Sequence, residues 1–164
     1  MRLSKLVPDP QAVLAMDPGS MTGIVTWMPD GVIRPYSLPP QDVYYVLEEW
    51  TETWAQARAW LVVEKFTITA NTGKMSNLGI DWPLKLTGVA EYLASRNGIL
   101  CDTGQMPSSA KRFAPDARLK AAGWMPQLRA AEGKHDHARD AARHLLLALC
   151  ENKVMEVPRV GAGD

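Results

Sequence analysis

Short apolar runs separated by turn residues open the chain, a pattern that is typical of paired β-strands. Runs at 12–17, 23–28 and 32–37 predict three strands. The segment MPDG between the second and third runs is typical of a hairpin turn. We therefore expect three consecutive antiparallel strands at the start of the fold.

After two prolines at 39–40 the pattern changes from strand to helix. Apolar side chains then recur at intervals of three and four residues, which predicts an amphipathic helix of about 16 residues. These side chains are Val43, Leu47, Trp50, Trp54 and Ala57. The apolar run WLVVE at 60–64 follows and predicts a buried strand that is parallel to an earlier one, because a helix separates the two.

The rest of the chain is mainly helical in pattern. We expect a helix over 84–96, a strand over 97–103, short helices in PSSAKRF and PDARLKAAGW, and a last helix over 136–151. The predicted fold class is α/β, with a five-stranded mixed sheet, three antiparallel strands then two parallel ones, flanked by helices. We expect one domain over 1–157 and a flexible tail over 158–164.

Composition narrows the possible classes of protein. The 164 residues are 46% hydrophobic and 22% charged, as in a soluble domain, and 18 Lys and Arg balance 18 Asp and Glu. Net charge therefore gives no general attraction to nucleic acid or membranes, although basic residues gather late in the chain. Two cysteines without metal-ligand spacing, and no apolar leader or spanning segment, favour a cytoplasmic protein with no membrane partner.

Two of the predicted strands end in an acidic residue, Asp17 in the first and Glu64 in the fourth. The carboxyl ends of neighbouring parallel strands share one edge of a sheet, and ligand sites form there. If these two strands are neighbours, the two carboxylates meet. Each acid considered alone is also an ordinary turn or surface residue.

The last predicted helix adds further polar groups. Asp136, His137, Asp140 and His144 fall within roughly 100° of one another beside its apolar stripe. Taken alone, the acids are typical of a first helical turn and the histidines of a solvated face. Taken with the strand-end acids, the acid pair Asp136 and Asp140 predicts an oxygen-rich site for Mg²⁺ or Mn²⁺, in which two ions about 3.5 to 4 Å apart would support phosphodiester hydrolysis.

Three segments resemble, in order, the motifs of the RuvC-type Holliday junction resolvases, which are ribonuclease H-like nucleases, and particularly the phage-type members. They are DPGSMTG at 17–23, VVEKF at 62–66 and HDHARDAARH at 135–144. The resemblance implies a ribonuclease H-like fold and a homodimer that resolves four-way DNA junctions. It also implies hydrolysis with Mg²⁺, symmetric nicks with 5′-phosphate and 3′-hydroxyl ends, and no small-molecule cofactor.

The resemblance assigns roles to single residues. Asp17, Glu64 and Asp140 become metal-binding catalytic carboxylates, and the fourth ligand is either His137 or Asp136. Asp17 would bridge the metal ions, and the fourth group would complete the site or aid proton transfer.

The same resemblance predicts residues that contact DNA. Phe66 stands where the family carries an aromatic wedge that stacks on bases, although an isolated Phe beside a strand is also a common core residue. The basic residues expected near the phosphate backbone are Lys65, Lys111, Arg112, Arg118 and Lys120. For the lysines at 111 and 120, a solvated helix face is the alternative.

Other functions remain compatible with these motifs. A less selective nuclease that trims branched or flapped DNA would use the same metal site, and a catalytically silent DNA-binding module would keep the fold without the metal. A nuclease for RNA/DNA hybrids fits the last motif less well. The actin and sugar-kinase fold needs two domains, which exceeds the length of this chain.

Overall fold

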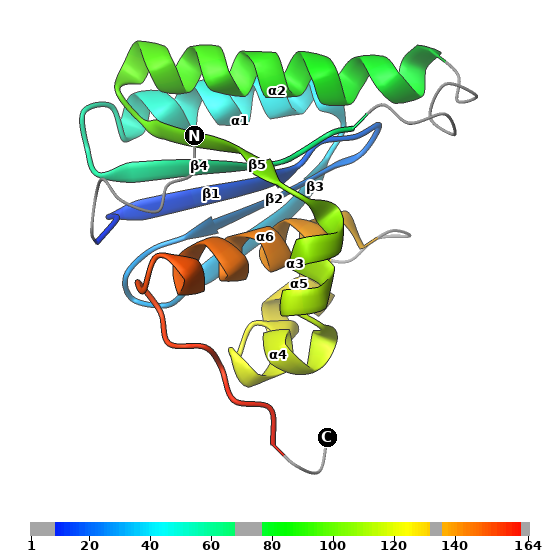
Figure 1. The fold of residues 1–164 in the computed structure, drawn as a ribbon. Helices are drawn as coiled ribbons and strands as arrows, with labels where there is room; N and C mark the ends of the chain where they lie inside the picture. Colours follow the sequence, from blue (N-terminus) through cyan, green and yellow to red (C-terminus); the bar gives the residue numbers. More distant parts are fainter. Residues whose placement is uncertain (1–8, 68–76, 132–135, 162–164) are drawn as a thin grey trace.

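The computed structural model describes residues 9–67, 77–131 and 136–161, which form three layers (Figure 1). The strands are β1 Ala12–Asp17, β2 Thr22–Trp27, β3 Ile33–Leu38, β4 Ala59–Glu64 and β5 Leu100–Gln105. The helices are α1 Pro40–Thr53, α2 Asn77–Asn97, α3 Pro107–Phe113, α4 Asp116–Ala121, α5 Met125–Ala131 and α6 His137–Glu151. Helices α1 and α2 cover one face of the sheet, and α6 with the short helices covers the other.

The sheet has the strand order β3-β2-β1-β4-β5. The strands β1, β2 and β3 pair antiparallel, whereas β4 pairs parallel with β1 and with β5. The predicted mixed sheet is therefore confirmed. Because β1 and β4 are hydrogen-bonded neighbours, their carboxyl ends lie side by side, as the sequence pattern required for a shared site.

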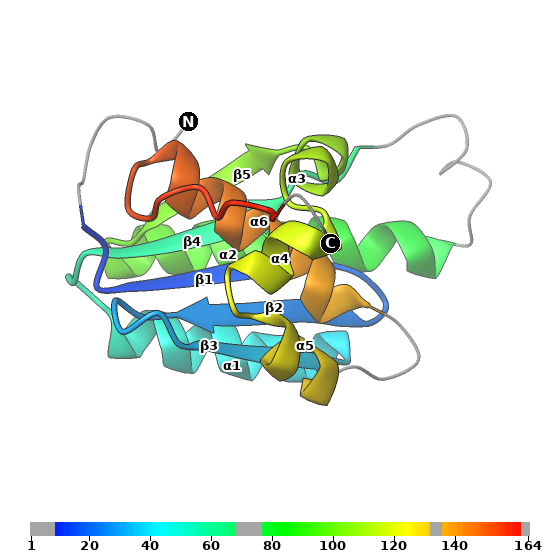
Figure 2. The same ribbon diagram turned by 90° about the horizontal axis from the view of Figure 1, so that it is seen from below.

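Successive residues of β1 supply both hydrophobic cores, because side chains alternate across a strand. Val13 and Ala15 pack in the core that contains the apolar stripe of α6. Leu14 and Met16 pack in the core that contains the buried side chains of α1 and α2. Figure 2 shows α6 lying across the sheet, where it contacts β1, β2, β3 and β4, and it also contacts the short helices α3, α4 and α5. This packing holds α6 against the strands that carry the candidate site.

Several predicted boundaries differ from the structure. The helix α2 begins at Asn77 rather than at residue 84, and Pro83 lies inside it. A proline lacks the N–H that continues a helix, which favoured a start after Pro83. Tertiary packing outweighs this cost: the ring of Trp82 contacts the ring of Tyr44 on α1, with centroids 6.3 Å apart.

Other differences lie at the ends of elements. The helix α1 ends at Thr53, so Trp54 caps it and Ala57 lies beyond it. Strand β5 begins at Leu100 rather than at 97, because α2 runs to Asn97 and Gly98 then turns the chain with φ +69°. Within the described ranges, no helix is both long and apolar enough to cross a bilayer.

Candidate active site

The carboxylates of Asp17 and Glu64 lie at the same edge of the sheet. The parallel register pairs Met16 with Val63, so each acid is the next residue along its strand. Their side chains are mostly buried, with 15% of Asp17 and 18% of Glu64 exposed. The structure thus brings together the two strand-end acids that the sequence predicted.

A glycine on β2 brings the start of α6 to this edge. Gly23 pairs with Asp17 across the antiparallel ladder. A Cβ atom on Gly23 would lie only 1.9 Å from the backbone oxygen of His137, a distance that no side chain can occupy. The absence of a side chain at position 23 therefore lets the first turn of α6 pack beside Asp17.

Burial and neighbouring charges both act on the carboxyl group of Asp17. Its pKa is raised from 3.8 to about 8, first by burial and then by repulsion from the carboxylates of Glu64 and Asp140. Lys111 opposes this shift. His137 also faces the site, with its Nδ1 atom 3.7 Å from Oδ2 of Asp17. The charges of Glu64 and Asp140 thus both act on Asp17 in the folded chain.

Asp140 is held by two cations. Lys111 of α3 places its Nζ atom 3.3 Å from Oδ2 of Asp140, and Arg143 donates to Oδ1 from the next turn of α6. Arg143 also donates to Asp116 of α4 over 2.7 Å, and Arg139 donates to the other oxygen of Asp116 over 2.9 Å. These ion pairs join α3, α4 and α6 beside the carboxylates.

His144 contacts Glu64 in the core, contrary to the alternative of a solvated histidine. Its side chain is 1% exposed, because α6 turns this face toward the sheet. Its Nε2 atom lies 2.7 Å from Oε2 of Glu64, and its Nδ1 atom lies 3.0 Å from Oε1 of Gln105. Neither His144 nor Gln105 was predicted as a site residue.

Signals for these missed residues were present in the sequence. His144 follows Asp140 by four residues, which places both on one side of a helix. Gln105 ends β5 in the same way that Asp17 and Glu64 end β1 and β4. The parallel pairing of β4 with β5 brings this third strand end to the same edge. Arg143 and Asp116 carried no comparable signal, because their contact joins separate helices.

The fourth predicted ligand has two candidates in different surroundings. The side chain of His137 is partly buried and faces Asp17. The side chain of Asp136 is 56% exposed, and its Oδ2 atom lies 3.5 Å from Nη1 of Arg139. In the part of the chain that the structure describes, no three His, Cys, Asp or Glu side chains are arranged closely enough to hold a metal ion.

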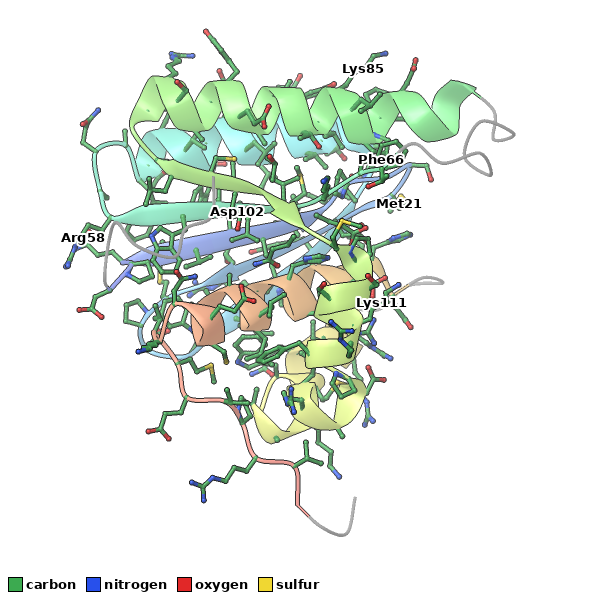
Figure 3. The ribbon with its side chains drawn as sticks, viewed as in Figure 1. Met21, Arg58, Phe66, Lys85, Asp102 and Lys111 are labelled. Atoms are coloured by element: carbon green, nitrogen blue, oxygen red, sulfur yellow. The ribbon has the colours of Figure 1, made fainter. Side chains whose placement is uncertain are left out.

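The predicted DNA-contacting residues follow β4 or lie on α3 and α4. Figure 3 shows Phe66, Lys111 and Met21 toward the same end of the molecule, with Arg58 at the other end. Phe66 is half-buried, whereas the side chains of Lys65, Lys111, Arg112 and Lys120 are exposed.

Arg118 has different surroundings from the other basic residues in this group. Its guanidinium stacks on the ring of Phe113, 4.9 Å from the centroid, and donates to the backbone oxygen of Phe113. These contacts connect α4 to the end of α3. In the described structure, Arg118 thus has a clear packing role between two short helices.

Comparison with known proteins identifies the fold. No protein-family model matches the sequence, and no curated protein matches it. Among solved structures, the chain is similar to T. thermophilus RuvC in complex with a Holliday junction substrate, with a TM-score of 0.56 and 14% sequence identity. The match covers 91% of this chain and 98% of that chain. The protein therefore has a RuvC-like, ribonuclease H-like fold.

Proposed function

We propose that this protein is a divalent-metal-dependent DNA endonuclease that resolves four-way junctions. The observation that carries the proposal is the interaction of Asp17, Glu64 and Asp140 at one edge of a RuvC-like sheet, where Glu64 and Asp140 both raise the pKa of Asp17. Buried carboxylates that repel one another are stabilised by a cation. The three motifs that resemble the RuvC-type resolvases supply these same three residues.

The donor chemistry of the site fits Mg²⁺ or Mn²⁺. Carboxylate oxygens are the ligands that these hard cations prefer, and Asp17, Glu64 and Asp140 would hold them, with His137 or Asp136 as the fourth group. When bound, such ions lower the pKa of a water molecule and stabilise the leaving oxygen of a phosphodiester. Both oxygens of Asp140 now face Lys111 and Arg143, so we expect metal binding to reorient this side chain.

The chain's own residues have separate roles in this proposal. Lys111 of α3 has an exposed side chain beside Asp140 and would bind the phosphate of the DNA strand to be cut. The exposed residues Lys65, Arg112 and Lys120 would contact neighbouring phosphates, and Arg118 would support α4. Phe66 follows Glu64 closely enough to stack on a base next to the cleavage position.

The proposed substrate is a four-way junction, cut by a homodimer in two symmetric strands to leave 5′-phosphate and 3′-hydroxyl ends. Support comes from the motifs, which are most similar to phage-type resolvases, and from the fold shared with a RuvC that was solved with such a junction. We propose that residues 1–157 form one catalytic domain. We also propose that the protein acts in the cytoplasm, which is that of the host if a phage encodes it.

A cleavage assay tests the proposal. Labelled four-way junction, duplex, flap and RNA/DNA hybrid are incubated with wild type, Asp17→Asn or Asp42→Asn, in Mg²⁺ or EDTA. Asp42 is an exposed acid on α1, on the other face of the sheet, and serves as the matched control. We expect paired nicks in the junction from wild type and Asp42→Asn, and a rate lower by about 100-fold or more for Asp17→Asn.

Three results would contradict the proposal in different ways. Equal cleavage of flaps and junctions would indicate the less selective debranching nuclease. Junction binding without cleavage in any metal would indicate a silent DNA-binding module. Cleavage that persists in EDTA or in Asp17→Asn would remove the metal-carboxylate site from the mechanism. Circular dichroism of both variants shows whether a loss of cleavage comes from the site or from unfolding.

A further inference from the structure

A buried chain of hydrogen bonds links β5, α6 and β4. It runs from the side-chain amide of Gln105 to the imidazole of His144, over 3.0 Å, and from there to the carboxylate of Glu64, over 2.7 Å. We infer that His144, supported by Gln105, is a positioning residue that fixes the orientation of the Glu64 carboxylate for metal binding. This inference rests on the proposed function.

Because His144 and Gln105 are buried, their side chains depend on each other and on Glu64 for hydrogen bonds. His144 is 1% exposed and Gln105 is 8% exposed, so neither side chain can satisfy its polar atoms with bulk water. The imidazole has a partner at both ring nitrogens, and rotation of the ring would break both hydrogen bonds. The backbone also contributes, because the N–H of Lys65 donates to the backbone oxygen of Gln105 over 2.9 Å and holds the residue after Glu64 against β5.

The direction of the hydrogen bonds follows from the chemistry of the groups. A carboxylate that binds a cation only accepts hydrogen bonds, so in that state the Nε2–H group of His144 donates a hydrogen bond to Oε2 of Glu64. The side-chain amide of Gln105 can form a hydrogen bond with Nδ1 of His144 whether or not that nitrogen carries a hydrogen. Its oxygen accepts from Nδ1–H, or its nitrogen donates to a bare Nδ1 when the amide is turned over. In both cases Glu64 receives a fixed donor on one oxygen before any cation arrives.

Two near-isosteric substitutions separate positioning from packing. In His144→Gln the amide nitrogen lies near the position of Nε2 and still donates to Glu64. In His144→Asn the amide reaches only the position of Nδ1, so the contact with Gln105 is kept and the contact with Glu64 is lost. Gln105→Met is a third variant, which keeps the side-chain volume and removes the support of the imidazole.

The test is calorimetric titration of Mn²⁺ into the folded protein without DNA, with junction cleavage as a second measurement. We expect His144→Gln to bind Mn²⁺ within a few-fold of wild type, and His144→Asn to bind about 10- to 100-fold more weakly. We expect Gln105→Met also to weaken Mn²⁺ binding, by a smaller factor than His144→Asn. Melting temperatures are measured for every variant without metal.

The outcomes distinguish this inference from the proposed function. Wild-type Mn²⁺ affinity in both His144 variants would overturn the positioning role. An equal loss in His144→Gln and His144→Asn that follows their melting temperatures would also overturn it, because packing alone would then explain the effect. If His144→Asn does not fold, wild-type affinity in Gln105→Met overturns the inference. Absence of Mn²⁺ binding by the wild type would overturn both this inference and the proposed metal site.

Discussion

The carboxyl group of Asp17 retains its proton in the folded chain to a pH near 8, because burial and the charges of Glu64 and Asp140 disfavour its ionised form. In an unfolded chain the same group loses its proton near its ordinary value of 3.8. The fold therefore holds this residue in a state that costs stability at neutral pH. A cation near the three carboxylates would lower the cost, and folding and metal binding should be coupled here.

The raised pKa of Asp17 predicts that the stability of the fold depends on pH. Between pH 4 and pH 8 the unfolded chain releases the proton of Asp17 while the folded chain keeps it, so stability falls as pH rises through this window and then levels off. Asp17→Asn removes the effect. In EDTA we expect this variant to gain of the order of 5 kcal/mol over wild type between pH 4 and pH 8.5, or about 10 to 20 °C in Tm.

Thermal unfolding followed by circular dichroism checks this prediction. Asp42→Asn, at the exposed start of α1, is the control and should show no such pH-dependent difference. A constant offset between Asp17→Asn and wild type at all pH values would show that Asp17 ionises normally in the fold.

At the scale of elements, the site depends on how α6 is placed. Its apolar stripe packs on one face of the sheet, and its first turn reaches Asp17 because Gly23 on β2 has no side chain. Two ion pairs from α6 to Asp116 then hold α4 beside it. The polar edge of α6 thereby brings His137, Asp140 and His144 to the strand ends.

Substitution of Gly23 tests this placement. In Gly23→Ala the new methyl group would overlap the backbone of His137, so α6 must move, and we expect a loss of about 2 to 3 kcal/mol together with most of the cleavage activity. Gly88→Ala is the matched control, because Gly88 lies in α2 with no atom within 4 Å of the added Cβ. It should be neutral or stabilise the protein by about 0.4 to 1 kcal/mol.

Urea unfolding of the two alanine variants gives both free energies, and the junction assay gives the activities. Wild-type stability and cleavage in Gly23→Ala would show that α6 can retreat from β2 without disturbing the site. Destabilisation by Gly88→Ala would mean that the outer side of α2 is covered in solution.

At the scale of the whole molecule, a zero net charge is combined with a local separation of charge. The buried acids lie at one sheet edge, and Lys111 of α3 and Arg143 of α6 lie beside them. DNA affinity would then come from a limited set of phosphate contacts, and the two-fold symmetry of a four-way junction would be matched by two copies of the chain.

Stoichiometry tests the proposed dimer. We expect light scattering after size exclusion to give twice the 18.1 kDa chain mass for the protein alone, and two chains per junction in the complex. The Asp17→Asn variant in EDTA allows the complex to be measured without cleavage. One chain per junction, with a single nick per molecule, would rule out symmetric resolution by a homodimer.

The buried faces of the elements and part of the candidate site can be predicted from the sequence alone. Alternation along β1 and the apolar stripe of α6 determine which residues face the cores, because these patterns depend only on local backbone geometry. The acids at the ends of two strands indicated the candidate site, since strand order along the chain already favoured a parallel pair. The meeting of Asp17 and Glu64 at one sheet edge was therefore predictable from the strand pattern. The choice of Asp140 over Asp136 came from the resemblance of its segment to a family motif, and its role as a ligand stays a prediction.

Tertiary structure alone decided the rest. The extension of α2 past Pro83, the burial of His144 between Glu64 and Gln105, and the pairing of Asp116 with two arginines all join residues far apart in the chain. Local periodicity carries no information about such partners, because it shows which face of an element is buried and not what lies opposite. The sheet order supplies that information by placing the ends of β1, β4 and β5 under α6.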